Sequence, residues 1–380
     1  LYSTIQGKKI MGGSSKSMLL PFNMPPVAKG GMLGFLSSGG GGVSGVWWKE
    51  IGRQTLTGSA DTLEVTGLDT YPYLMVFAFV NVTGGDSDCT WTGGNDGGYL
   101  GDYAERRQEN GGSSASTTNR SSNGIIFDDG SSQPYFVTGF ISNIDDEEKF
   151  CVWQTVMSSS AGAGTAPDRC NTFGKLSNSA QLTRLKLNVG RLAGTAAAGS
   201  QIIIAGYDPS SPDGNNLWTQ LGTAEVTGSA SATLDITTLS SLKDYLMIEV
   251  FIPSGSAHHG FLYFNNDDNA SNENYCRRGN AQANGSDFTT APDNEINFTH
   301  DTNHNKYWTS FWLNKQSAVK KGVSTYTDTN TTKTMQICFK WDNTSNQIGD
   351  VASGYAIRLS KSTSSADFPV GTKMTCWGFS

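Results

Sequence analysis

The stretch Tyr73–Val76 (Tyr-Leu-Met-Val) decides the fold, because it returns later in the chain as Tyr245–Ile248 (Tyr-Leu-Met-Ile). Shortly before each copy stands a second matched pair, Thr62–Thr66 (TLEVT) and Thr233–Thr237 (TLDIT). The spacing between matching residues stays between 170 and 172 from the first match to the last. Such a constant spacing indicates an internal duplication, so we expect two copies of one domain in tandem.

The repeated segments have the patterns of β-strands. Leu63 and Val65 alternate with polar residues, which is the period of a half-buried strand. Tyr73–Val80 is apolar at strand length, which is typical of a central strand buried on both faces. No window of the sequence longer than two helical turns has a clean helical period, so we expect little helix. We expect the first strand of each copy to pair or pack with the last one, Gly199–Tyr207 in one copy and Gly371–Phe379 in the other.

These patterns predict an all-β fold, with two tandem antiparallel jelly-roll-like β-sandwich domains and an extended N-terminal arm. The repeats set the expected boundaries. The arm covers residues 1–46, the first sandwich 47–208, a Pro-containing linker 209–216, and the second sandwich 217–380.

The arm is rich in Gly and Pro and cannot build a core of its own. It is either a solvated tail or an extended segment that docks on a partner. The docking interpretation is favoured, because a solvated tail does not need so many large apolar side chains. The candidate docking residues are Leu19, Leu20, Phe22, Met32, Leu33, Phe35 and Leu36.

Composition excludes several classes of protein. The net charge is −7, with no strong basic cluster, which argues against a protein that binds duplex nucleic acid. The longest apolar stretch is too short to cross a bilayer, so no membrane insertion is expected. The six cysteines form no CxxC pair and are too sparse for a disulfide scaffold. We expect them to be free, buried thiols in a chain made in a reducing compartment.

Two acidic runs are candidates for a metal or catalytic site. Asp145–Glu148 resembles a carboxylate cluster, but consecutive side chains point in different directions, so a solvated turn is favoured. Asp267–Asn269 lies in an Asn-rich loop and has the residue types that bind calcium. Asx residues more often stabilise tight turns, which is the favoured interpretation here.

Histidines and aromatic residues offer two further candidates. A zinc site from His300 and His304 needs helical geometry and a third ligand, whereas the intervening sequence is typical of a loop. In the aromatic run Tyr307–Trp312, alternation places Trp308 and Trp312 on one face of a strand and Phe311 on the other. Such a run can stack on sugars, but core packing is favoured. No residue is therefore assigned as catalytic, cofactor-binding or metal-ligating.

Several short segments resemble virion structural proteins of marine tailed bacteriophages. They are the glycine-rich Gly31–Gly42, the strand at Trp48–Ile51, the loop Phe264–Asp267 with Asn274–Tyr275 after it, and the closing strand Gly371–Phe379. Such proteins usually have one domain of this kind, whereas this chain has two, and the loop motif is degraded in the first copy. The resemblance implies a tail, fibre or capsid-decorating part, commonly multimeric and without a cofactor.

The expected function is therefore that of a non-enzymatic virion structural protein, assembled in the host cytoplasm and attached through its arm. The expected partners are other virion proteins of the capsid or tail and further copies of the chain, with a trimer favoured. Two alternatives stay open. One is an adhesin that binds a host receptor or surface glycan, and the other is a polysaccharide depolymerase, which needs only two suitable carboxylates.

Overall fold

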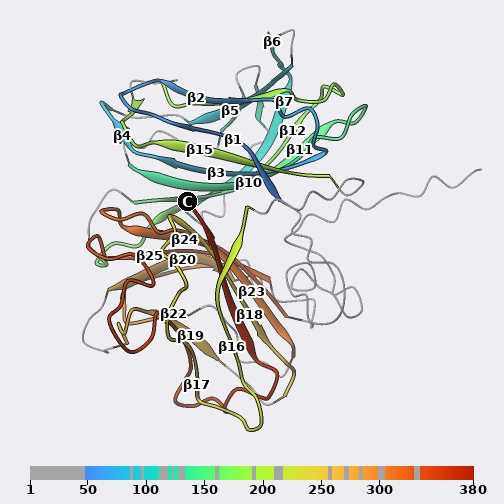
Figure 1. The fold of residues 1–380 in the computed structure, drawn as a ribbon. Helices are drawn as coiled ribbons and strands as arrows, with labels where there is room; N and C mark the ends of the chain where they lie inside the picture. The colour runs from blue at the N-terminus through green and yellow to red at the C-terminus, as the bar shows by residue number, and fades with distance from the viewer. Residues whose placement is uncertain are drawn as a thin grey trace, which may run out of the picture. The chain divides into compact units, whose positions relative to one another are not determined.

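The computed structural model describes residues 48–85, 89–95, 98–110, 119–121, 124–126, 133–158, 162–190, 194–208, 217–255, 259–268, 274–281, 286–297, 304–328 and 334–380 (Figure 1). The seven candidate docking residues of the arm and the linker 209–216 lie outside these ranges. The secondary structure of the described residues consists of β-strands in antiparallel pairs, which confirms the all-β prediction. This part of the chain contains no helix with the length and apolarity needed to cross a membrane.

The first repeat forms a sandwich of two main sheets. The larger sheet has eight strands, in the spatial order β1 (Lys49–Thr55), β15 (Gln201–Tyr207), β3 (Tyr73–Val80), β10 (Tyr135–Ser142), β11 (Lys149–Met157), β12 (Asp168–Leu176), β7 (Tyr103–Glu109) and β8 (Asn119–Ser121). The smaller sheet contains β2 (Thr62–Thr66), β13 (Arg184–Asn188), β5 (Thr90–Asn95), β6 (Gly98–Tyr99) and β9 (Ile125–Ile126). A separate short pair joins β4 (Val82–Thr83) and β14 (Thr195–Ala196).

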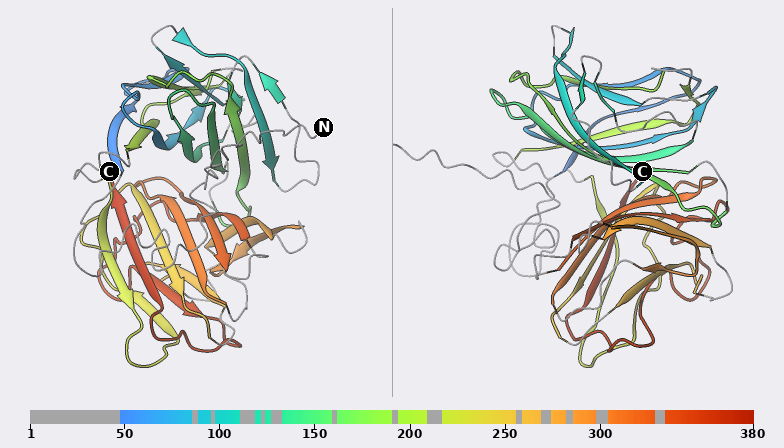
Figure 2. Two further views of the ribbon diagram at one scale, coloured as in Figure 1. Left: turned by 90° about the vertical axis from the view of Figure 1, so that its right-hand side faces the viewer. Right: turned by 180° about the vertical axis from the view of Figure 1, so that it is seen from behind.

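The second repeat forms a sandwich of the same kind. Its larger sheet has eight strands, in the order β16 (Thr219–Glu225), β27 (Lys373–Phe379), β18 (Tyr245–Ile252), β23 (Lys306–Leu313), β24 (Lys320–Asp328), β25 (Thr334–Trp341), β20 (Tyr275–Ala281) and β21 (Ser286–Asp293). In Figure 2 (left) the red β27 lies between the yellow-green β16 and the yellow β18. Its smaller sheet contains β17 (Thr233–Ile236), β26 (Ile357–Lys361), β19 (Gly260–Phe264) and β22 (Ile296–Asn297).

The two larger sheets match strand for strand. In each, the first strand of the repeat pairs with the last one, β1 with β15 and β16 with β27, as the sequence predicted. Even the irregularity is shared, because the register shifts between Glu50 and Gly52 in one copy and between Gln220 and Gly222 in the other. This common frame allows equivalent positions in the two repeats to be compared directly.

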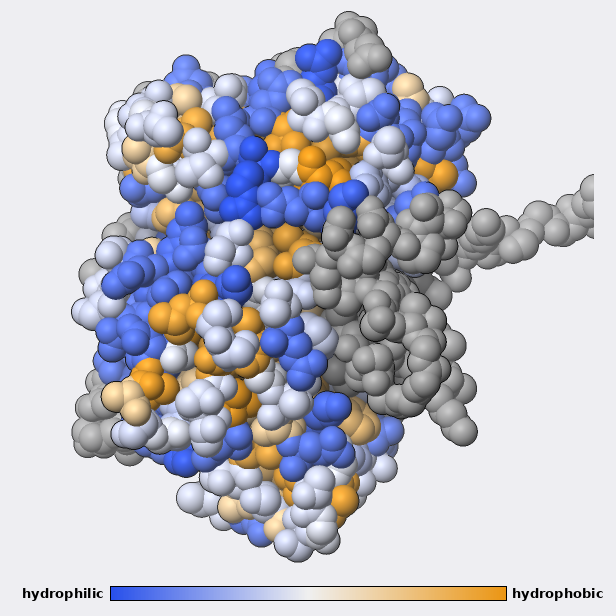
Figure 3. Space-filling view, viewed as in Figure 1, coloured by the Kyte–Doolittle hydropathy of each residue, from blue (hydrophilic) through white to orange (hydrophobic). Residues whose placement is uncertain are grey.

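Each sandwich has its own apolar core. The first core includes Leu63, Val76 and Trp153, and the second includes Trp308 and Trp312. The prediction that Trp308 and Trp312 pack in a core is therefore confirmed. On the face shown in Figure 3, hydrophobic residues form small patches separated by hydrophilic ones, as on an ordinary protein surface.

One asparagine closes the same turn in both copies. The amide of Asn143 donates to the carbonyls of Leu68, Tyr71 and Leu182, each at 3.2 Å, and its oxygen accepts from the Leu182 N–H at 2.7 Å. Asn314 stands 171 residues later and likewise accepts from a backbone N–H, that of Ile348, at 2.6 Å. Buried backbone groups at the strand ends are thus satisfied in the same way twice.

A lysine stabilises the turn that follows. Lys149 donates through Nζ to the carbonyls of Ile144, Glu147 and Ser179, and Lys320 makes the corresponding contacts in the second copy. The acidic run Asp145–Glu148 is the outer part of this turn. Its first three side chains are exposed, and Glu148 forms an ion pair of 2.9 Å with Lys175. The prediction of a solvated turn is confirmed.

The outer faces of the two larger sheets contact each other within the compact unit Ser44–Ser380. The ring of Phe77 lies among four aromatic rings of the second sandwich, with centroids 5.2 to 6.2 Å away; they belong to Trp218, Tyr245, Phe311 and Phe379. Farther along the interface between the two larger sheets, the contacts are polar and not aromatic. Asn171 donates to Gln336 at 2.9 Å, and Arg278 pairs with Asp168 at 2.7 Å. Apolar burial at one end and paired polar groups at the other hold the two sandwiches together.

Candidate functional site

The outer face of the smaller sheet in the second sandwich carries an unusual set of side chains. Along β19, Leu262 and Phe264 are buried in the core, whereas Phe261 and Tyr263 are half-buried on the opposite face. Because strand side chains alternate between faces, Arg358 of β26 and Asp235 of β17 lie on this same face.

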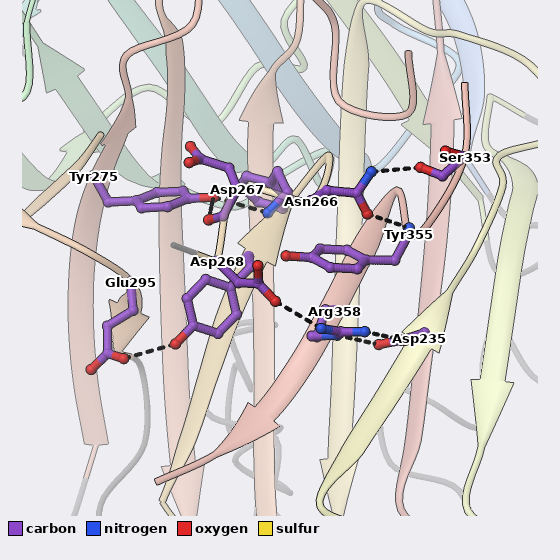
Figure 4. A network of polar contacts seen from close by, with 11 residues as sticks. Asp235, Asn266, Asp267, Asp268, Tyr275, Glu295, Ser353, Tyr355 and Arg358 are labelled. Carbon is purple, nitrogen blue, oxygen red and sulfur yellow. Dashed lines mark hydrogen bonds and ion pairs between the residues drawn. The ribbon is translucent and has the colours of Figure 1, made fainter. Parts of the chain in front are cut away.

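Arg358 is the centre of the network in Figure 4. Its guanidinium donates to both carboxylate oxygens of Asp235 at 2.8 Å and to Asp268 at 2.7 Å. The same group lies 4.1 Å from the ring centroid of Tyr355, a cation–π distance. The hydrogen bonds to Asp235 raise the pKa of Arg358, against the opposing effect of desolvation. Both carboxylates are thus paired with a permanent cation.

The loop of Asn265 to Asp268 is built by turn chemistry. Asn265 and Asn266 both have positive φ, which asparagine tolerates better than most residues. Asn266 accepts from the Tyr355 N–H at 2.7 Å and donates to the Ser353 carbonyl (Figure 4). The backbone N–H of Asp267 donates to the Phe264 carbonyl at 2.9 Å and closes the turn.

The carboxylate of Asp267 accepts hydrogen bonds from neutral donors. Trp341 Nε1 donates to it at 2.8 Å and Asn274 Nδ2 at 3.1 Å, while the Tyr275 hydroxyl donates to the Asp267 carbonyl at 3.1 Å. These contacts support the predicted turn role of this acidic run, of which Asn269 lies outside the described residues. Over the described ranges, no group of three or more His, Cys, Asp or Glu side chains is arranged to hold a metal ion.

Tyr263 extends the network across the face. Its hydroxyl donates to Glu295 Oε2 at 2.9 Å, and burial raises the pKa of Glu295. Beside it, Arg277 pairs with Asp293 at 3.3 Å, and burial raises the pKa of Asp293 as well. Glu295 thus has a hydroxyl partner and Asp293 a cationic one.

His259 stands at the edge of the same face. Its Nε2 is 2.7 Å from Asn297 Oδ1, and its ring centroid is 5.0 Å from that of Phe261. The zinc site considered from sequence needs His300, which lies outside the described residues. His259 was only one of four histidines in the sequence, and nothing in the local pattern distinguished it.

The first sandwich lacks this arrangement. In the matching register, Lys186 takes the place of Arg358, Glu64 that of Asp235, and Thr92 that of Tyr263. The aromatic and bidentate features are thus specific to the second repeat. Sequence analysis singled out Tyr307–Trp312 as the aromatic candidate and missed Phe261 and Tyr263, although their alternation within one strand was visible.

Comparison with known proteins assigns the chain to no family. No protein-family model and no curated protein sequence matches the chain. Among solved structures, the LG1–3 region of the laminin alpha2 chain is similar with a TM-score of 0.21 and 9% identity, over 83% of this chain and 64% of that one. The chain thus spans less than two thirds of that region, and a TM-score this low carries no argument about function.

Proposed function

We propose that the chain is a non-enzymatic structural protein of a tailed-bacteriophage particle. It is a capsid-decorating or tail- or fibre-associated component, and its arm, residues 1–46, attaches it to other virion proteins. The sequence resemblance points to this class. The interface between the sandwiches is the structural observation that supports it most, because two domains held face to face suit a rigid part displayed on a large assembly.

The paired state of the carboxylates favours this role over an enzymatic one. Asp235 and Asp268 both bind Arg358, and the carboxylate of Asp267 accepts from Trp341 and Asn274. General acid–base catalysis needs a carboxyl whose proton can move to a substrate. Acids held in an ion pair, as Asp235 and Asp268 are, or by two neutral donors, as Asp267 is, are better suited to fixing loops.

Attachment in this proposal depends on many weak contacts. Copies related by symmetry each contribute a docked arm, and the sum of modest affinities becomes persistent binding. The oligomer favoured here is a trimer. Sedimentation equilibrium of the full chain tests it directly, since the chain has a mass of 40.6 kDa. A species of three chains is expected, and a monomer at every concentration contradicts the oligomer.

The arm is tested by substitution in the full chain during particle assembly. Leu33→Ser, Phe35→Ser and Leu36→Ser are combined in one variant, and Ser14→Ala, Ser15→Ala and Ser17→Ala in a matched control. We expect the first variant to unfold at the same temperature as the wild type but to be missing from purified particles, as judged by quantitative mass spectrometry. If the first variant is present in purified particles in the same amount as the wild type, the arm does not anchor the chain.

A glycan-binding adhesin is the second candidate, and one observation favours it. Phe261 and Tyr263 stand two positions apart on one face of β19, so their backbone positions are about 7 Å apart along the strand. Flat aromatic faces beside Asp235, Arg358 and His259 combine stacking surface with hydrogen-bonding groups. A glycan array checks this candidate, with Phe261→Ala/Tyr263→Ala as the test variant and Phe150→Ala/Phe173→Ala as the control. Equal signals from both variants, or no signal at all, count against it.

A further inference from the structure

Two phenylalanines are exposed on the outer face of the larger sheet in the first sandwich. Phe150 of β11 is 39% exposed and Phe173 of β12 is 47% exposed, and they are two of the four large apolar side chains exposed in the described part of the chain. Between them, Val152 of β11 lies opposite Phe173 in the register, so both side chains are on one face of the sheet. We call Phe150, Val152 and Phe173 the apolar strip.

The second repeat has an equivalent surface on β24 and β25. The registers of β11 with β12 and of β24 with β25 match, and Lys149 and Lys320 make the same turn contacts in the two copies. The residues equivalent to the apolar strip are, in the same order, Lys321, Val323 and Cys338. All three are buried, so the same surface is covered in one repeat and open in the other.

The first sandwich covers this surface in the second repeat. Lys321 donates to the Pro134 carbonyl at 2.6 Å, and the Cys338 thiol donates to the Thr155 carbonyl at 3.6 Å. Both carbonyls belong to the same end of the β10–β11 pair. The partner that this surface takes in the second repeat is therefore another copy of the same domain.

An arginine flanks the surface in both repeats. Arg278 lies opposite Cys338 and pairs with Asp168 of the first sandwich at 2.7 Å. Its equivalent, Arg106, lies opposite Phe173. Arg106 is exposed, and its guanidinium has no hydrogen bond or ion pair among the described residues. The first repeat thus presents both the apolar strip and the cation of a contact that is complete in the second repeat.

We propose that the apolar strip is a contact surface for a second copy of the chain. This surface takes another copy of the domain in the second repeat, whereas in the first repeat its two rings are exposed. The strip is also more apolar than its equivalent, because Phe150 replaces Lys321 and Phe173 replaces Cys338. Exposed apolar patches mark interaction sites, because covering them removes apolar area from water.

The strip continues an interface that is already formed. Phe140 lies opposite Val152 in the sheet and contacts Phe311 of the second sandwich. A second copy on the strip extends this apolar surface outward and, by analogy with Asp168, brings a carboxylate to Arg106. A sheet face that meets the strand ends of a neighbour is a heterologous contact, which can close into a ring such as a trimer. The inference rests on the oligomer of the proposed function and names a surface that forms it.

Sedimentation equilibrium of the full-length chain measures the association. Phe150→Ser/Phe173→Ser removes both rings and is expected to raise the dissociation constant roughly tenfold or more. Leu242→Ser/Val370→Ser changes the other two exposed apolar side chains and is expected to associate like the wild type. Thermal unfolding verifies that both variants are folded. Because a smaller oligomer binds a glycan surface with less avidity, the glycan-array signal of Phe150→Ala/Phe173→Ala is read together with its oligomeric state.

Hydroxyl-radical footprinting, read for each residue by mass spectrometry, tests where the second copy binds. In the wild type, oxidation of Phe150 and Phe173 is expected to fall severalfold as the protein concentration passes the dissociation constant. Oxidation of Leu242 and Val370 is expected to stay constant. Protection of Phe150 and Phe173 that does not change with concentration indicates that a segment of the same chain covers them, and it overturns the proposal.

The results distinguish the strip from the oligomer. A wild type that stays monomeric at every concentration overturns both the strip contact and the proposed oligomer. If the wild type associates and Phe150→Ser/Phe173→Ser associates equally well, the strip contact alone is wrong. Arg106→Glu is expected to weaken association as well, because it reverses the charge where Arg278 binds a carboxylate. Association as tight as that of the wild type in this variant also overturns the proposal, because the strip then does not bind as its equivalent does.

Discussion

Phe140 and Phe311 occupy equivalent positions in the two repeats and contact each other across the interface, with ring centroids 6.4 Å apart. A second equivalent pair, Asn171 and Gln336, is joined by a hydrogen bond of 2.9 Å. Their equivalence follows from the matching registers of β11–β12 and β24–β25. These two contacts join equivalent positions, but the interface as a whole is not symmetric, because Cys338 is buried against Thr155 whereas the equivalent residue of the first repeat, Phe173, is exposed.

Phe77 is the ring that fills the aromatic end of the interface. Phe77 is 1% exposed, and replacing it with Ala leaves a cavity among four aromatic rings. We expect Phe77→Ala to lower the free energy of unfolding by about 3–5 kcal/mol. Phe173→Ala removes the same side chain at a 47% exposed site and is expected to cost about 0.5 kcal/mol or less. Urea unfolding compares the two, and equal losses would show that Phe77 is not at a packed interface.

Each core places a tryptophan ring directly over a glycine, but on opposite strands of the same hairpin. Trp153 of β11 covers Gly139 of β10, whereas Trp312 of β23 covers Gly322 of β24. A Cβ at either glycine overlaps the ring. We expect Gly139→Ala and Gly322→Ala each to destabilise the protein by roughly 1–3 kcal/mol.

Gly58→Ala is the matched control for these two variants, since its added Cβ meets nothing within 4 Å. Thermal unfolding followed by circular dichroism is the measurement. If Gly139→Ala has the same melting temperature as the wild type, the ring of Trp153 is free to move aside and the prediction is wrong.

The repeated asparagine gives a third prediction. Asn143→Ala leaves the Leu182 N–H and several buried carbonyls without their partners. Because an orphaned buried group costs about 1–3 kcal/mol, we expect a loss of about 3 kcal/mol for Asn143→Ala and a similar loss for Asn314→Ala. Asn346→Ala, at an exposed turn, is expected to be nearly neutral. If Asn143→Ala lowers the midpoint of urea unfolding no more than Asn346→Ala does, the carbonyls that Asn143 binds find other partners, and the prediction is wrong.

The thiols should be chemically silent in the folded protein. All six cysteines are buried and form no disulfide bond with one another, and burial raises the pKa of Cys151, Cys276 and Cys338 to about 12. Since the thiolate is the reactive form, we expect labelling by a disulfide reagent at pH 7.5 to be limited by opening of the structure, with six thiols reacting in denaturant. Rapid labelling of any thiol before denaturation contradicts this burial.

Much of the fold was predictable because the duplication shows the same pattern of strand residues twice in one sequence. The alternation at Leu63 and Val65 and the match of Gly199–Tyr207 with Gly371–Phe379 gave the strands and the pairing of first with last. The solvated turn at Asp145–Glu148 followed from its charge. These features depend on local period and composition, which a sequence displays directly.

The interface could not be predicted in this way. Tyr73–Val80 appeared buried on both faces, but the sequence did not say that one face meets the other repeat. Phe77 is packed by residues more than 140 positions away, and no local pattern in the sequence indicates this. The network around Arg358 was missed for the same reason, because Asp235, Asp268 and Tyr355 reach it through strand pairing and loop closure.

The face-to-face contact of the two repeats is the central claim, and a double-mutant cycle on Phe77 and Phe379 tests it most directly. Their rings lie 5.2 Å apart in an edge-to-face arrangement, one from each sandwich. Unfolding of the wild type, Phe77→Ala, Phe379→Ala and the double variant gives the coupling between them. We expect a coupling energy of about 1 kcal/mol. Strictly additive losses would mean that the two rings do not touch in solution, and the account of one interlocked pair of sandwiches would be wrong.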